Sequence, residues 1–230
     1  MSKLLLQGLR RYQSDLRPRY RDRFATLASG QSPHALIITC ADSRVVPNLI
    51  ASADPGELFT VRNIANLVPV YSEDGDSSVG AAIAYAVSVL HVRDIVVCGH
   101  SSCGGANALL APPHSDPSVR RWLEPARMTV DILESQGPLD PTRPLGDCVS
   151  QLSAVHQLGN LLTHPSVRDA VKADELSLHA WWFDIPTGEV LAYASDQDRF
   201  VTAVDQLERI VRSPRASGLH GVSATEGAAE

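Results

Sequence analysis

Three residues whose side chains suit Zn²⁺ follow two apolar segments of the sequence. Cys40 comes directly after the run 35–39. His100 and Cys103 come shortly after the run 95–98. Two thiolates and one imidazole supply three bonds to zinc, whereas a closed structural site normally uses four, so the fourth position remains open to water. The types and spacing of these residues therefore predict metal chemistry.

A parallel β-sheet is the element that would bring these three residues together. Short apolar segments with strand character cover 35–39, 57–62 and 95–98, and helices are expected between them at 46–52 and 77–90. In open α/β sheets, ligand sites lie beyond the carboxyl ends of the strands. We therefore predict an α/β fold with a mainly parallel central sheet flanked by helices, and with the metal ligands at one end of the sheet.

The sequence predicts that the whole chain is divided into three parts. An arginine-rich helical arm covers 1–30, one domain covers 31–212, and a polar tail that we expect to be disordered covers 213–230. Within the domain, helices are expected at 118–136 and 148–162, and a break follows at Thr163-His164-Pro165. The segments 176–183 and 190–194 predict a strand pair with a turn, which would add an antiparallel strand at the edge of the sheet.

Composition narrows the class of protein. The chain has 230 residues, 44% of them apolar, which is enough to bury one substantial core. The net charge of -6 argues against a general nucleic-acid partner. The longest apolar stretches, such as 79–90, are too short to span a membrane, and no signal peptide is evident, so we expect a cytoplasmic protein. Four cysteines do not make a disulfide scaffold, and Cys98 and Cys148 are expected to be structural.

Three common catalytic or nucleotide-binding motifs do not fit. The segment 99–103 lacks the last glycine of a serine nucleophile elbow. Gly104 is not followed by the Lys and Ser or Thr that a P-loop requires, and no G-x-G-x-x-G follows the first strand. A zinc site is therefore favoured over a serine nucleophile for acyl transfer, over a site for nucleotide phosphates and over a site for a nicotinamide cofactor.

Two segments carry a resemblance to a known family. They are Cys40-x-Asp42-x-Arg44 and His100-x2-Cys103-Gly104-Gly105. Together with 55–57, 61–66 and 81–87 they make residues 30–110 similar to the β-class carbonic anhydrases, and a weaker likeness continues through 160–168 and 178–184. The resemblance implies one Zn²⁺ per subunit, held by Cys40, His100 and Cys103, and reversible hydration of CO2 to bicarbonate and a proton through zinc-bound hydroxide.

The resemblance also implies roles for two residues beside the ligands. Arg44 would hold the carboxylate of Asp42 away from zinc, and Asp42 would accept a hydrogen bond from the zinc-bound hydroxide. A planar guanidinium suits this role because it can bind both carboxylate oxygens at once. In a closed state, which occurs among relatives, Asp42 itself would be the fourth zinc ligand.

Within this family, the sequence is most similar to the plant-like group, whose site is open. The residues implied to form the pocket for CO2 are Gln31, Phe59, Ile64, Tyr85 and Gly104. The group with a bicarbonate-regulated closed site carries a tryptophan three residues before the first zinc cysteine, and Ile37 stands there in this chain. We therefore expect an open site without that form of regulation.

The resemblance further implies a homodimer as the smallest working unit, and often a homotetramer or larger assembly. Phe59 and Tyr85 would reach the pocket across the interface, and the arm at 1–30 would wrap the partner. Two alternatives remain open at this point. One is a closed-site, noncatalytic zinc protein, and the other is a related hydrolase that acts on CS2 or COS.

Overall fold

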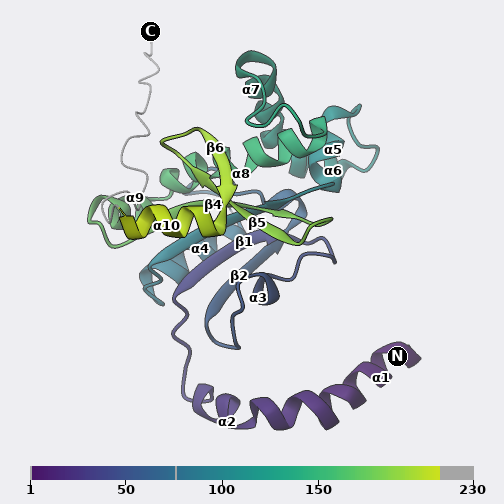
Figure 1. The fold of residues 1–230 in the computed structure, drawn as a ribbon, viewed down its shortest axis with the longest axis vertical. Helices are drawn as coiled ribbons and strands as arrows, with labels where there is room; N and C mark the ends of the chain where they lie inside the picture. The colour runs from purple at the N-terminus through teal and green to yellow at the C-terminus, as the bar shows by residue number, and fades with distance from the viewer. Residues whose placement is uncertain (1, 76, 213–230) are drawn as a thin grey trace.

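A six-stranded mixed β-sheet forms the centre of the chain (Figure 1). The structure is a computed structural model that describes residues 2–75 and 77–212, so the tail expected at 213–230 lies outside the described residues. The strands lie in the order β2-β1-β3-β4-β5-β6. They are β1 (Ala35–Cys40), β2 (Leu58–Asn63), β3 (Asp94–His100), β4 (Ser177–Asp184), β5 (Glu189–Ala194) and β6 (Arg199–Thr202).

The four strands β2, β1, β3 and β4 are parallel, as the sequence predicts. β1 pairs with β2 on one side and with β3 on the other, and β3 pairs with β4. All six residues of β1 are buried, which explains its continuous apolar sequence. This register places Cys40 beside Asn63 at the carboxyl ends of β1 and β2.

The predicted antiparallel strand pair is confirmed, but its second strand is not the edge of the sheet. β4 and β5 pair in antiparallel register, and β6 adds a further antiparallel strand outside β5. The sequence did not predict β6, because a strand of four residues is too short to show an alternating pattern. The sequence analysis also did not predict the helix that follows it, α10 (Ala203–Arg212).

Helices cover one face of the parallel sheet. The helices that pack there are α4 (Ser78–Ser88), α8 (Leu145–Thr163) and α9 (Pro165–Lys172). Leu36 and Ile38 of β1, and Ile95 and Val97 of β3, lie in the same core cluster as the buried residues of these helices. Ile37 points to the opposite face, where it packs with Val96 and Cys98. Alternate residues of the same strands therefore form two separate parts of the core.

A second group of helices packs around the carboxyl ends of β1 and β3. Its members are the 3-10 turn η2 (Ile64–Asn66), α5 (Gly104–Leu110), α6 (Pro117–Leu123), η3 (Glu124–Arg127) and α7 (Met128–Gln136). The helix predicted at 118–136 is therefore interrupted. η3 separates α6 from α7. Pro125 stands in the first turn of η3, and proline lacks the N–H that a continuous helix needs at that point. The single-turn helix α3 (Pro47–Ile50) lies between β1 and β2 in the sequence.

The N-terminal arm stands apart from the rest of the chain (Figure 1). It consists of α1 (Lys3–Arg11), the π-helical turn η1 (Tyr12–Leu16) and α2 (Arg17–Leu27), and none of these elements has a buried residue. Arg23 fixes the base of the arm, since its guanidinium donates to the carbonyl of Pro55 and to Glu57. Four leucines of α1 remain exposed, at 79% for Leu4, 63% for Leu5, 51% for Leu6 and 53% for Leu9.

None of the helices in the described ranges combines the length and the apolar character that a membrane-spanning segment requires.

Candidate metal centre

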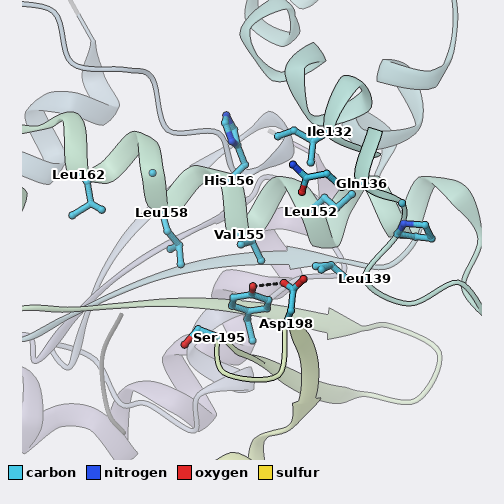
Figure 2. A pocket seen from close by; sticks show the side chains of 14 residues that line it. Ile132, Gln136, Leu139, Leu152, Val155, His156, Leu158, Leu162, Ser195 and Asp198 are labelled. Carbon is cyan, nitrogen blue, oxygen red and sulfur yellow. Dashed lines mark hydrogen bonds between the residues drawn. The ribbon is translucent and has the colours of Figure 1, made fainter. Parts of the chain in front are cut away.

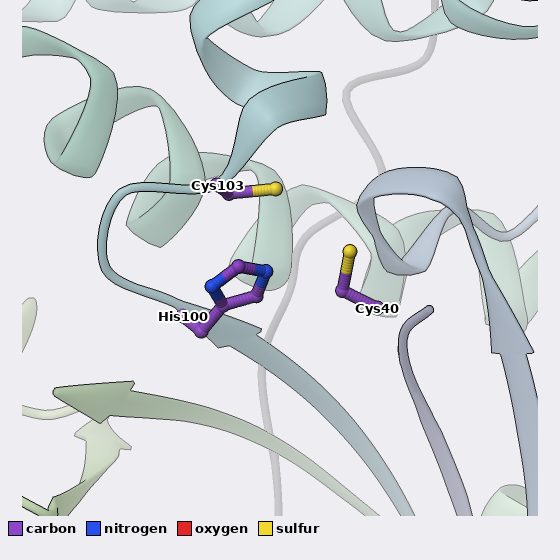
Figure 3. Close-up of side chains that lie close together, drawn as sticks. All are labelled: Cys40, His100 and Cys103. Atoms are coloured by element: carbon purple, nitrogen blue, oxygen red, sulfur yellow. The ribbon is translucent and has the colours of Figure 1, made fainter. Parts of the chain in front are cut away.

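The three predicted metal ligands meet at the carboxyl ends of β1 and β3 (Figure 3). Cys40 is the last residue of β1, His100 is the last residue of β3, and Cys103 follows the turn after β3. Their ligand atoms lie within 4.8 Å of one another, and all three residues are buried. Residues 60 positions apart in the sequence are thus brought together by the pairing of two parallel strands.

The imidazole of His100 is oriented to bind a metal. Its Nδ1 lies 2.9 Å from the carbonyl oxygen of Ser101, which assigns the N–H to Nδ1. Its Nε2 is buried and has no hydrogen-bond partner among the described residues. A buried nitrogen without a partner is costly unless a ligand binds it. Together with two adjacent sulfur atoms, this nitrogen fits a zinc ion.

The turn between His100 and Cys103 is held from helix α8. Ser102 adopts a left-handed conformation with φ of 54°, and its N–H donates to Asp147 at 2.6 Å. Ser150, one turn further along α8, donates to the carbonyl of His100 at 2.9 Å and accepts from its N–H at 3.3 Å. Helix α8 therefore fixes the backbone on both sides of the histidine ligand.

Asp42 and Arg44 form the ion pair that the sequence motif implies. Nε of Arg44 donates to Oδ1 of Asp42 at 2.9 Å, and Nη2 donates to Oδ2 at 2.8 Å. The hydrogen bonds from Arg44 hold the pKa of Asp42 well below its usual range. Oδ2 of Asp42 also lies 4.0 Å from Nε2 of His100, so the carboxylate borders the metal ligands while Arg44 binds both of its oxygens.

The two thiols of the centre have opposite pKa shifts because they share a hydrogen bond. A hydrogen bond with Cys103 lowers the pKa of Cys40 to about 4, and the same contact raises the pKa of Cys103. By contrast, burial raises the pKa of Cys98 to about 12. The hydrogen bond between the two sulfurs therefore favours loss of one proton from the pair, which supplies the thiolate character that a metal ligand needs, whereas burial keeps the thiol of Cys98 protonated in the core.

Comparisons with known proteins agree with this geometry. The family model described as carbonic anhydrase matches residues 35–190. The solved β-carbonic anhydrase CcaA is 35% identical, with a TM-score of 0.80 over 87% of this chain and 98% of that one. This chain belongs to the β-class carbonic anhydrases. A carbonic anhydrase of Pseudomonas aeruginosa is 39% identical over 206 residues, which cover 89% of this chain and 93% of the relative.

This chain is also similar to a tetrameric relative. One of two tetrameric β-carbonic anhydrases from Sordaria macrospora is 31% identical to this chain. Its TM-score is 0.71, over 82% of this chain and 94% of that one. The similarity of this β-class carbonic anhydrase to its relatives therefore extends over nearly the whole fold, beyond the residues around the metal ligands.

Two of the five predicted pocket residues lie beside the metal ligands. Gly104 follows Cys103 at the start of α5. Ile64 begins η2, is 46% exposed, and comes within 3.3 Å of the position that a Cβ on Gly105 would occupy. Trp122 holds this turn by donating from its indole N–H to the carbonyl of Ile64 at 2.8 Å.

The other three predicted pocket residues lie elsewhere in the chain. Phe59 stands opposite Leu36 in the sheet, four residues before the end of β2, or about 13 Å along the strand. Tyr85 of α4 places its ring 6.0 Å from that of Phe59. Gln31 is exposed and precedes β1, at the end of the sheet remote from Cys40. A single chain of this carbonic anhydrase therefore does not assemble the full predicted pocket.

Sequence reasoning gave no role to Arg62, although it lies in a segment that resembles the family. Its guanidinium donates to the carbonyl of Cys40 at 3.1 Å from both Nε and Nη2, and Nη2 also donates to the carbonyl of Asp42. It thus fixes the backbone that carries a metal ligand and the adjacent carboxylate. The pairing of β1 with β2 is the signal that predicts this contact, since Arg62 stands beside Thr39.

Proposed function

We propose that this chain converts CO2 and water reversibly into bicarbonate and a proton, with one zinc ion held by Cys40, His100 and Cys103. The observation that carries the proposal is the buried, unpartnered Nε2 of His100 between two cysteine sulfurs and the Asp42–Arg44 pair. Zinc, when bound, acidifies water and so makes hydroxide available near neutral pH. Membership of the β-class carbonic anhydrases supports the choice of CO2 as the substrate.

Asp42 is proposed to accept a hydrogen bond from the water that reacts with CO2, and Arg44 is proposed to position the carboxylate of Asp42. Because Arg44 binds both oxygens of Asp42, the carboxylate is kept ionised and its direction is fixed. Asp42 is not among the residues whose ligand atoms cluster within 4.8 Å. For it to become a fourth zinc ligand, the bidentate pair with Arg44 would first have to open. This geometry favours an open site of the plant-like type.

The pocket for CO2 is proposed to form between two copies of the chain. Ile64 and Gly104 would come from the chain that holds the zinc, while Gln31, Phe59 and Tyr85 would come from the partner subunit. The 45% exposure of Tyr85, together with the distance of Phe59 from Cys40, supports this division. An apolar wall suits a nonpolar substrate such as CO2 because it excludes competing water.

The same reasoning divides the chain into two parts and gives a role to the arm. We assign residues 31–212 to the catalytic domain and residues 1–30 to assembly of a homodimer or a larger homo-oligomer. The exposed leucines of α1 support this role, since each buried leucine contributes about 1.5–3 kcal/mol. A cytoplasmic location, expected from the sequence, stays a prediction.

The decisive experiment is stopped-flow CO2 hydration by the zinc-loaded protein at about pH 8. The Asp42→Ala and Arg44→Lys variants and a chelated sample are measured beside it. We expect fast hydration that chelation abolishes, and a loss of at least about a hundredfold in kcat/KM for Asp42→Ala. Arg44→Lys should lose about tenfold, because an ammonium cannot bind both oxygens of Asp42.

The matched control for this experiment is Arg120→Lys, which changes an exposed arginine of α6 and should retain full activity. Slow hydration by protein that binds a full equivalent of zinc would contradict the proposal and indicate a closed site or another substrate, such as CS2 or COS.

A further inference from the structure

A cavity separate from the metal centre lies between α7, α8 and the turn that joins β5 to β6 (Figure 2). Its volume is about 610 Å³, within the range of about 300–1,000 Å³ that is typical of small-molecule sites. Its lining is mixed, and the apolar side chains in it include Ile132, Leu139, Leu152, Val155, Leu158 and Leu162. None of the three metal ligands contributes to it.

Polar groups stand on two sides of these apolar side chains. Figure 2 shows His156 near Gln136 on one side of α8, and Asp198 on the other. The hydroxyl of Tyr193 donates to Oδ1 of Asp198 at 2.6 Å. Burial and the carboxylate of Asp198 raise the pKa of Tyr193, so the phenol keeps its proton and continues to donate.

The carboxylate of Asp198 is therefore held at the edge of the cavity through Oδ1, which leaves Oδ2 for another donor. Among the described residues, only its Oδ1 takes part in a hydrogen bond. Asp198 ends the turn between β5 and β6 with φ of 49°, a conformation that aspartate tolerates better than most residues. Oδ2 is free to bind a donor that enters the cavity.

The charges around the cavity favour a cation. No lysine or arginine is found among the described residues that line it, and Asp198 is the only acidic one. Burial lowers the pKa of His156, so its imidazole is neutral near pH 7 and adds no positive charge. An anion would meet the carboxylate of Asp198 without a compensating cation, whereas an ammonium group would pair with it.

We propose that this cavity binds a small organic cation, with an apolar body packed against α8 and an ammonium group at the carboxylate of Asp198. The site is independent of the zinc centre and of the proposed pocket for CO2. The body of the ligand would contact Val155, Leu158 and Leu162, and its charged end would lie beside the Tyr193–Asp198 pair.

Three probes of nearly equal shape test the charge preference: phenethylammonium, the neutral 2-phenylethanol and the anionic phenylacetate. Each is titrated into the zinc-loaded full-length protein, and the methyl NMR signals of Val155, Leu158 and Leu162 report binding at this cavity. Their shifts separate it from anion binding at the metal centre. We expect phenethylammonium to bind with a Kd of about 1 mM or tighter, about fivefold tighter than 2-phenylethanol, and phenylacetate to bind most weakly.

Two variants test the site itself. Asp198→Asn keeps a hydrogen-bond acceptor for Tyr193 and removes the charge, so phenethylammonium should bind about fivefold more weakly while 2-phenylethanol changes less than about twofold. Gly159→Leu fills the cavity from α8, where a Cβ on Gly159 would meet no atom within 4 Å. This substitution also favours the helix, so the variant should fold and lose all three probes.

Matched controls separate these effects from nonspecific ones. Gly159→Ala adds one methyl group and should retain binding, and Asp22→Asn removes a distant exposed charge of the arm and should change nothing. The proposal is overturned if none of the probes shifts the three methyl signals at about 10 mM. It is equally overturned if phenylacetate binds as well as phenethylammonium, or if binding survives Gly159→Leu.

Discussion

The metal centre and the arm-bearing side of the molecule differ in how complete they are within one chain. At the metal centre all three ligands are buried, and the backbone around them is held by Arg62, Ser150 and Asp147. In the arm, by contrast, not one described residue is buried, and the leucines of α1 face solvent. One chain therefore brings the three candidate ligands together, whereas the proposed pocket around the substrate would need a second copy.

The strongest test of the first half of this comparison is the pair of variants Cys40→Ser and Cys98→Ala. A serine hydroxyl does not ionise near neutral pH, so Cys40→Ser should lose most of its zinc and at least about a thousandfold in CO2 hydration. Zinc content by elemental analysis and stopped-flow hydration measure the two effects.

Cys98→Ala is the matched control for that test, since Cys98 lies two residues before His100 in β3 but is a core thiol with a pKa raised to about 12. It should keep its zinc and its activity. Equal zinc loss in both variants would show that general destabilisation, and not ligand loss, explains the effect of Cys40→Ser.

The second half of the comparison is tested by placing charges on the arm. Leu5→Asp with Leu9→Asp changes two residues on one face of α1 that are already exposed in a single chain, so the fold of the chain should be unaffected. If α1 docks on a second copy, two buried carboxylates should dissociate the assembly. Hydration should then fall about tenfold, because Phe59 and Tyr85 of the partner subunit are lost from the pocket.

Analytical ultracentrifugation together with stopped-flow hydration measures this prediction. Val204→Asp is the matched control, since Val204 is 66% exposed in α10 and lies outside the arm. An assembly that persists with both carboxylates in place would contradict the role given to the arm.

The same difference decides how much could be predicted from the sequence. The ligands and the Asp42–Arg44 pair lie next to buried parallel strands, where short apolar runs fix the register and a local motif carries the chemistry. The contacts of Ser150 with the end of β3 and of Asp147 with the turn after it depend on how α8 packs, about 50 residues away in sequence, and no local pattern encodes that. For the same reason the Tyr193–Asp198 side of the cavity was not predicted.

A smaller effect, on stability, is expected from two adjacent glycines at the metal centre. A Cβ on Gly105 would lie 2.7 Å from the Cβ of Ala65, which is already in a left-handed conformation with φ of 62°. Gly105→Ala should therefore lower the free energy of unfolding by about 1–3 kcal/mol. Gly104→Ala, whose Cβ would meet nothing within 4 Å, should change it by less than about 0.5 kcal/mol.

Urea denaturation of the two glycine variants, with equal zinc loading, measures the difference between them. Because η2 and α5 belong to a single chain, the difference in stability reports how tightly one chain builds its metal centre. Equal stability of the two variants would mean that η2 can move without cost, and that the metal centre is less tightly built than these contacts indicate.

The smallest expected effect concerns His156, on the outer side of the helix whose Ser150 supports the metal centre. Burial lowers its pKa in the folded protein below the value of about 6.5 that it has when unfolded. The unfolded chain therefore binds more protons as the pH falls, so the stability that neutral His156 gives is present above about pH 6.5 and is lost below it. In His156→Gln, the fall in Tm between about pH 7.5 and pH 5.5 should be smaller by about 1–2 °C than in the unchanged protein.

Calorimetry of both proteins measures this difference in Tm, with His114→Gln, a change at an exposed histidine, as the control. A steeper fall for His156→Gln would mean that this side of α8 holds a charged histidine, which would remove one of the grounds for a cation in the adjacent cavity.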